Sequence, residues 1–147
     1  MATTPRPREI FAKVQESIQN GGRGEVADFY AEDAEVEHVF GVGQAKWRGR
    51  EELRAFFDRR VSDRMKLKAH NTFVHETTDP EVIVAEWDYD LVDTETGMTV
   101  RLPNLVVMRI RDGLIVSSRD YHNHLALAAA SGKLRDLVAM LENTDAA

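Results

Sequence analysis

Four long strand-like runs follow one another between residues 66 and 122, and they constrain the fold more than any other feature: KLKAHNTFVHETT, EVIVAEWDYDLVD, MTVRLPNLVVMRIR and GLIVSSRDYH. The segments between them, TDPE, TETG and RDG, have the residue types of tight turns. Connections this short leave no room for a crossover, so each strand is expected to pair antiparallel with the next. Because a sheet of long strands twists and curls, the pattern predicts a strongly curved antiparallel sheet.

The first part of the chain predicts helices instead. Apolar residues recur at helical spacing up to Ile18, and NGG at 20–22 is expected to stop that helix. A short second helix is expected at about 23–31. The segment REELRAFFDRRVSDRM predicts a third helix, whose buried stripe would contain Leu53, Phe56, Phe57 and Val61.

A strand is expected between the second and third helices. The segment EDAEVEHVFG alternates with period two, so that Val36, His38 and Phe40 would share one face. The following GQAKWRG has the character of a return strand or a turn.

A C-terminal helix is expected at about 123–142, where SGK at 131–133 would divide it into two short helices. The second of these would lie over a pocket or on a partner subunit. Helices that are segregated from an antiparallel sheet make an α+β fold. At 147 residues the chain is expected to form one domain, 1–147, whose N-terminal helices close one end of the curled sheet and leave a pocket.

Charge and composition exclude several classes of partner. The formal net charge of -6 argues against nucleic acid and against acidic membrane surfaces, because both would repel the chain. There is no cysteine, which excludes disulfides, thiolate catalysis and cysteine-ligated metals. No run has the character of a signal peptide or the length of a membrane span, so a cytoplasmic location is expected.

The segment YAEDAEVEHVFGVGQAKWRGREELRAFF resembles the nuclear transport factor 2-like superfamily. That superfamily includes steroid isomerases, limonene epoxide hydrolases, SnoaL-like polyketide cyclases and the phenazine-biosynthesis A/B proteins. The C-terminal half is most similar to the SnoaL-like and phenazine A/B branch. The resemblance implies a cone-shaped fold around a pocket, with a C-terminal helical extension. It also implies a homodimer formed through the outer sheet face, where Leu105, Val107 and Ile115 would lie.

The junction SSRDYHNH, residues 117–124, holds the first candidate site. The resemblance to the SnoaL-like branch implies that Asp120 is the acid/base at the end of the last strand. By strand parity Asp120 and His122 share one face, and apolar walls would raise the pKa of the Asp120 carboxyl group, which suits proton transfer. Alternatively, Asp120 or Asn123 only caps the following helix. Tyr121 would point the other way and pack.

His38 is the second candidate for catalysis. It stands where the steroid isomerases carry their aspartate base, and histidine also exchanges protons near neutral pH. The alternative is a purely structural histidine whose ring nitrogens are hydrogen-bonded within the core. Steroid isomerase activity itself is not expected, because Val14 occupies the place of their tyrosine and NLVVM lacks their second acid.

Glu86 and Asp88 share one face of their strand, while Trp87 and Tyr89 share the other. If the acids face inward they form a carboxylate cluster that could contact substrate; if the aromatic residues face inward, the acids meet solvent. Alternation alone leaves both arrangements open. The Asp-Arg-Asp relay of the epoxide hydrolases is not reproduced in this segment.

Four further residues are candidates for substrate binding. Tyr30 is expected on the second helix, Trp47 is expected at a pocket mouth or interface, and Asn104 is expected to face inward. His70 is the fourth, and parity places it on the opposite side of its strand from His75.

No metal or cofactor is predicted. HNH lacks the spacing of a metal motif, no glycine-rich phosphate loop precedes a helix, and no nucleophile elbow is present. We therefore expect a cofactor-free enzyme that acts by acid/base catalysis on a small hydrophobic carbonyl-bearing molecule, through isomerisation, cyclisation or dehydration. The alternative is a non-catalytic module that binds a small ligand or dimerises.

Overall fold

The structure is a computed structural model that describes residues 3–60 and 63–145. Its elements are α1 (Pro7–Gln19), a 3-10 helix η1 (Gly24–Phe29), β1 (Tyr30–His38), β2 (Lys46–Arg48), α2 (Arg50–Arg60), β3 (Met65–Glu76), β4 (Val82–Asp93), β5 (Thr99–Arg111), β6 (Leu114–His122), α3 (His124–Ala130) and α4 (Leu134–Asp145). The four predicted long strands, the return strand and the divided C-terminal helix are confirmed. None of the helices in the described ranges is long and apolar enough to cross a membrane.

The six strands form one sheet in the order β2-β1-β6-β5-β4-β3. Consecutive long strands pair antiparallel, as their short turns predict. β1 is different, because it lies parallel to β6 and brings His38 level with Asp120. This one parallel pairing joins the N-terminal part of the chain to the end of the last strand.

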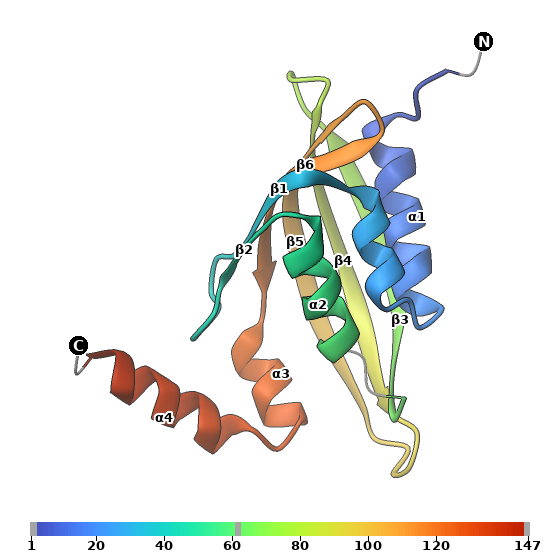
Figure 1. Cartoon of the computed structure of the whole chain (residues 1–147). Coiled ribbons are helices and arrows are strands. Elements are labelled where there is room, and N and C mark those ends of the chain that lie inside the picture. Colours follow the sequence, from blue (N-terminus) through green and yellow to red (C-terminus); the bar gives the residue numbers. More distant parts are fainter. Residues whose placement is uncertain (1–2, 61–62, 146–147) are drawn as a thin grey trace.

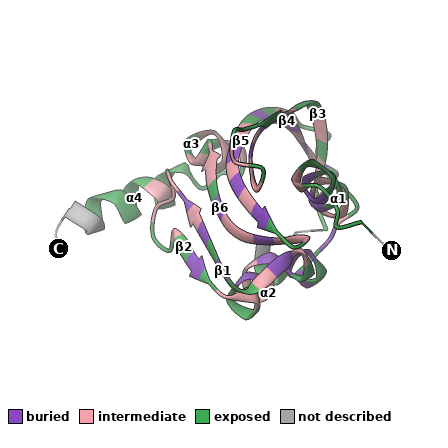
Figure 2. Ribbon diagram, turned by 90° about the horizontal axis from the view of Figure 1, so that it is seen from above, coloured by how far each residue is buried: buried purple, intermediate pink, exposed green. Residues whose placement is uncertain are grey.

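The sheet curls around its inner face, and α1, η1 and α2 pack inside the curl (Figure 1). Seen from above, the strands sweep around an interior that α1 and α2 close, whereas α4 projects away from the body (Figure 2). The helices and the inner face of the sheet share a buried apolar core that includes Phe11, Val14, Leu53 and Val106. This is the predicted α+β cone with a C-terminal helical extension.

Two predictions for the N-terminal part of the chain need correction. The segment expected as a helix over 23–31 is a 3-10 helix that ends at Phe29, and Tyr30 already begins β1. Phe40 was expected on the inner face, but β1 ends at His38 and Gly41 N–H donates to the His38 carbonyl in a turn, which leaves Phe40 63% exposed. Val61, expected in the stripe of the third helix, lies outside the described residues.

Irregular pairing changes the parity of two strands. In β3 the register with β4 shifts between His70 and Phe73, and Asn71 has a positive φ of 54°. This extra residue puts His70 and His75 on the same outer face, so the prediction of opposite faces is wrong. The β5–β6 register also shifts, and Ile115, expected outside, is fully buried in the core.

Candidate active site

Three titratable side chains meet on the inner face where β1 and β6 end. The parallel register sets His38 beside Asp120, and His122 follows two residues later on the same face of β6. Nε2 of His38 lies 3.6 Å from Asp120 Oδ2, and Nε2 of His122 lies 3.5 Å from the same oxygen. His38 thus lies on the strand next to that of Asp120. One carboxylate therefore stands between two imidazoles.

Asn104 fixes the orientation of His122. Its side-chain nitrogen donates to the carbonyl oxygen of Leu102 at 2.7 Å, which leaves Oδ1 as the atom that faces the imidazole. His122 Nδ1 lies 2.7 Å from this Oδ1, and since an amide oxygen only accepts, Nδ1 carries the hydrogen. His122 Nε2 is thereby left to exchange a proton with Asp120. Asn104 faces inward as expected and also lines the cavity described below.

The electrostatics of Asp120 differ from the expectation. Burial by itself raises the pKa of the Asp120 carboxyl group, but hydrogen bonding from His122 and Ser118, with the nearby His38, outweighs burial and holds the pKa below its ordinary value. The Ser118 hydroxyl donates to the other carboxylate oxygen. The predicted rise in pKa is therefore wrong, and the lowered pKa keeps the Asp120 carboxyl group ionised at neutral pH.

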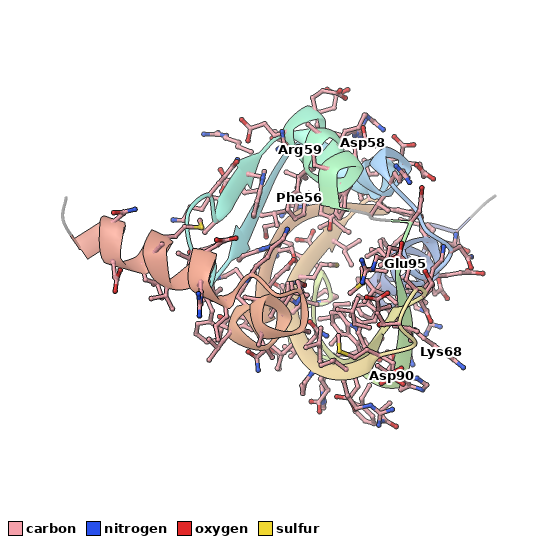
Figure 3. All side chains as sticks on the ribbon, turned by 90° about the horizontal axis from the view of Figure 1, so that it is seen from below. Phe56, Asp58, Arg59, Lys68, Asp90 and Glu95 are labelled. Atoms are coloured by element: carbon pink, nitrogen blue, oxygen red, sulfur yellow. The ribbon has the colours of Figure 1, made fainter. Side chains whose placement is uncertain are left out.

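Aromatic side chains form the wall behind this cluster. The rings of Trp47 and Phe56 pack on His38 with centroid distances of 4.6 and 5.5 Å. Trp47 was expected at a pocket mouth or interface, but it is buried behind His38. Figure 3, seen from below, shows Phe56 on the inner side of α2. An inner cavity of about 50 Å³ opens between this wall and the sheet, and Tyr30, His38, Asp120 and His122 line it.

A larger cavity of about 520 Å³ lies outside the inner one. His122 lines both cavities, as do Phe57 and Tyr89, so the two are neighbours. Apolar residues from the sheet and from the C-terminal helices, including Leu102 and Leu127, form much of the outer lining. The volume lies within the range typical for small-molecule sites. The second C-terminal helix contributes to this lining, as one of the two alternatives predicted.

Four of the residues predicted to bind substrate line neither cavity, and Trp47, buried behind His38, is the first of them. Trp87 and Tyr89 are buried on the inner face of β4, which decides the alternative that alternation left open. Consequently Glu86 and Asp88 lie on the outer face, where Glu86 contacts His75 at 2.9 Å and Asp88 accepts a hydrogen bond from Asn71.

His70 is the fourth of these residues. Its Nε2 lies 2.8 Å from Asp90, which is also held by Arg101 on the outer face. His70 pairs with the outward-facing Asp88 before the bulge begins, so its side chain faces outward and the predicted substrate contact by His70 is wrong.

The rest of SSRDYHNH behaves as a helix cap and a packing surface. Asn123 accepts a hydrogen bond from Ala126 N–H and caps α3, as one of the alternatives predicted. Tyr121 points the other way and packs edge-on against Phe40. His124, which sequence reasoning did not place in the site, has its ring centroid 5.4 Å from that of His38. The second histidine of HNH was the only sign of it in the sequence.

The same cluster has the donor atoms of a metal site. Among the described residues, His38, Asp120 and His122 are the group whose ligand atoms all lie within 4.8 Å of one another. Two imidazoles and a carboxylate suit several divalent cations. The arrangement thus allows proton exchange and also has the chemistry of coordination.

The family model that describes the SnoaL-like domain matches residues 12–118. The chain belongs to the SnoaL-like domain family. Among curated proteins, this SnoaL-like chain is 25% identical over 127 residues to an uncharacterised PhzA/B-like protein of Pseudomonas aeruginosa, with 85% of this chain and 89% of the other covered.

Solved structures share the fold of this SnoaL-like domain. A candidate isomerase of Bacillus subtilis superimposes with a TM-score of 0.78 at 22% identity, covering 86% of this chain and 93% of the other. A candidate polyketide cyclase of Xanthomonas campestris superimposes with a TM-score of 0.71 at 21% identity, covering 87% of this chain and 98% of the other. A phenazine biosynthesis-related protein of Pseudomonas aeruginosa superimposes with a TM-score of 0.64 at 18% identity, covering 86% of this chain and 83% of the other.

Proposed function

We propose that this protein is a cofactor-free enzyme that moves protons on a small, largely apolar molecule bearing a carbonyl group. The observation that carries the proposal is the Asp120 carboxylate, which stands between His38 and His122 at the inner end of a mostly apolar cavity. Membership of the SnoaL-like family and the candidate isomerase and cyclase among its structural neighbours support this reaction class.

The proposed mechanism is a paired proton transfer. Asp120, as an ionised base, takes a proton from the carbon next to the substrate carbonyl. His122, protonated on Nε2, gives its proton to the carbonyl oxygen, so that a neutral enol forms without a free enolate. Asn104 accepts a hydrogen bond from Nδ1 of His122, and therefore the exchangeable proton of His122 is the one on Nε2.

Returning the two protons at other atoms gives the product. Delivery to a different carbon is an isomerisation, attack of the enol carbon on a second carbonyl is a cyclisation, and loss of a neighbouring hydroxyl is a dehydration. His38, 3.6 Å from Asp120, would stabilise the carboxylate and exchange a proton with it. All three reactions need the same first step.

That first step can be measured before the product is known. Aromatic and polyketide-like ketones would be incubated with the protein in D2O, and deuterium incorporation next to the carbonyl followed by mass spectrometry. Incorporation that needs Asp120 supports the enzyme. Binding without incorporation by any compound favours the alternative, a module that only holds a ligand or dimerises.

The experiment also tests the role of metal. We expect the exchange to persist after the protein is treated with a chelator, because the proposed mechanism uses only side-chain protons. Loss of exchange, restored by a divalent cation, would show instead that His38, Asp120 and His122 act as ligands.

A further inference from the structure

Three cationic residues line the outer cavity from three different parts of the chain. Arg59 is in the last turn of α2, Lys66 is near the start of β3, and Lys133 directly precedes α4. Figure 3 shows Arg59 at the open end of the molecule, in the view from below. All three are exposed, so they lie at the rim of the cavity.

These three cations differ from most arginines of the protein. Most arginines are engaged by carboxylates: Arg64 pairs with Asp93 and Arg109 with Glu81. Within residues 3–60 and 63–145, by contrast, Arg59, Lys66 and Lys133 have no carboxylate within ion-pair distance. Their charges are therefore available to a ligand.

The acids of the same cavity leave a net positive rim. Asp63 and Asp136 also line it, but Asp63 lies 2.5 Å from Arg23 and is thereby neutralised. One free acid thus stands against three free cations. This local balance opposes the charge of the whole chain, which is -6, so it does not simply reflect composition.

The inner end of the cavity has the opposite character. Leu67, Leu91 and Leu102 form an apolar lining between the rim and His122. Beyond His122 stands the Asp120 carboxylate, which would repel an anion. An anionic group on a ligand is therefore favoured at the rim and disfavoured at the inner end.

We propose that the outer cavity binds an apolar molecule that carries an anionic group, such as a carboxylate, at one end. The anion lies at the rim beside Arg59, Lys66 and Lys133, and the apolar end points toward His122. The inference rests on the proposed function only in taking this cavity as the substrate site, and it narrows the substrate to the class of apolar organic anions.

A matched pair of fluorescent probes tests the proposal on the full chain. 1-Anilinonaphthalene-8-sulfonate is an apolar anion, and N-phenyl-1-naphthylamine is the same molecule without the sulfonate. We expect the anion to bind more tightly, with a preference that shrinks as salt is raised. Each of Arg59→Gln, Lys66→Gln and Lys133→Gln should weaken binding of the anion about two- to fivefold, the scale of an exposed ionic contact, and leave the neutral probe unaffected.

Lys68→Gln is the matched control. Lys68 is an exposed lysine two residues after Lys66 on the same strand; it points away from the interior and does not line the cavity (Figure 3). Equal binding of the two probes, or an equal loss of affinity in Lys68→Gln, would overturn the proposal. Either result leaves the deuterium exchange by Asp120 standing, whereas a protein that prefers the anion but exchanges no deuterium would count against the proposed function alone.

Discussion

At the residue scale, the proposal depends first on Asp120. Asp120→Asn keeps the size of the side chain and can still accept the Ser118 hydrogen bond, but it cannot take up a proton at neutral pH. We expect deuterium exchange to fall about a hundredfold or more, the usual scale for loss of a general base, while unfolding changes little. Exchange rates and thermal melting of the two proteins check this. A variant that exchanges as fast as the parent would remove Asp120 from the mechanism.

Asn104 should act through His122 and not on the substrate directly. Asn104→Leu removes the acceptor that holds the Nδ1 hydrogen, so His122 can turn or adopt the other tautomer. We expect the rate to fall about tenfold or more and its pH profile to change. Asn104→Asp keeps an acceptor at this point and should retain more activity than Asn104→Leu. Equal pH profiles in all three proteins would reduce Asn104 to a packing residue.

Strand parity predicted the inward positions of His38, Asn104, Asp120 and His122, because alternation is a local property of each strand. The lowered pKa of Asp120 could not be predicted in the same way. It depends on the distance to His122 on the same strand and on the distance to His38, which follows from the parallel pairing of β1 with β6. Burial and hydrogen bonding act in opposite directions on the carboxyl group, and only the geometry decides between them.

At the element scale, local signals predicted the four long strands and their turns, since turn chemistry acts over a few residues. Two departures from regular pairing escaped prediction. The bulge after His70 and the register shift after Ile115 each add one residue, so side chains on the two sides of the irregularity have opposite parity from that of a regular strand. The predictions of opposite faces for His70 and His75 and of an outward Ile115 failed for this reason.

The connection between β3 and β4 carries a charge network that should control stability in acid. Glu81 accepts hydrogen bonds from Arg111 and Arg109 at 2.8 Å, and these lower the pKa of its carboxyl group from 4.5 to about 2. A carboxyl group with a lowered pKa stabilises the folded state above its ordinary pKa, and this contribution is lost as the pH falls from 4.5 to about 2.

Glu81→Gln should therefore melt at a lower temperature than the parent protein at pH 7, and the difference should vanish as the pH approaches about 2. Melting curves across this range measure the effect. Glu76→Gln is the control, because Glu76 is an exposed acid at the end of β3 with no arginine partner in the described chain. The network would be irrelevant to acid stability if both variants followed the same pH course.

At the scale of the whole molecule, the placement of α4 is the feature that its own sequence explains least. Its apolar periodicity and the break at Gly132 predicted a second helix, and the structure contains it. Yet Leu134, Val138 and Leu141 are 41–48% exposed, and α4 projects from the body (Figure 2). A helix gains stability mainly by burying an apolar stripe, so this stripe predicts a surface that covers it.

We expect that covering surface to come from a second copy of the chain, as the predicted homodimer implies. Leu105 and Val107, on the outer face of β5, are half-buried in the single chain and would extend the apolar contact. Light scattering should give the mass of a dimer at micromolar concentration.

Removal of residues 133–147 should then lower the melting temperature or the dimer affinity, because the exposed stripe would lose its partner. Val138→Asp should have the same direction of effect, while Asn143→Asp, on the same helix outside the stripe, should have little. A monomeric parent protein, or a truncated protein with unchanged melting and mass, would show that α4 serves only as a wall of the outer cavity.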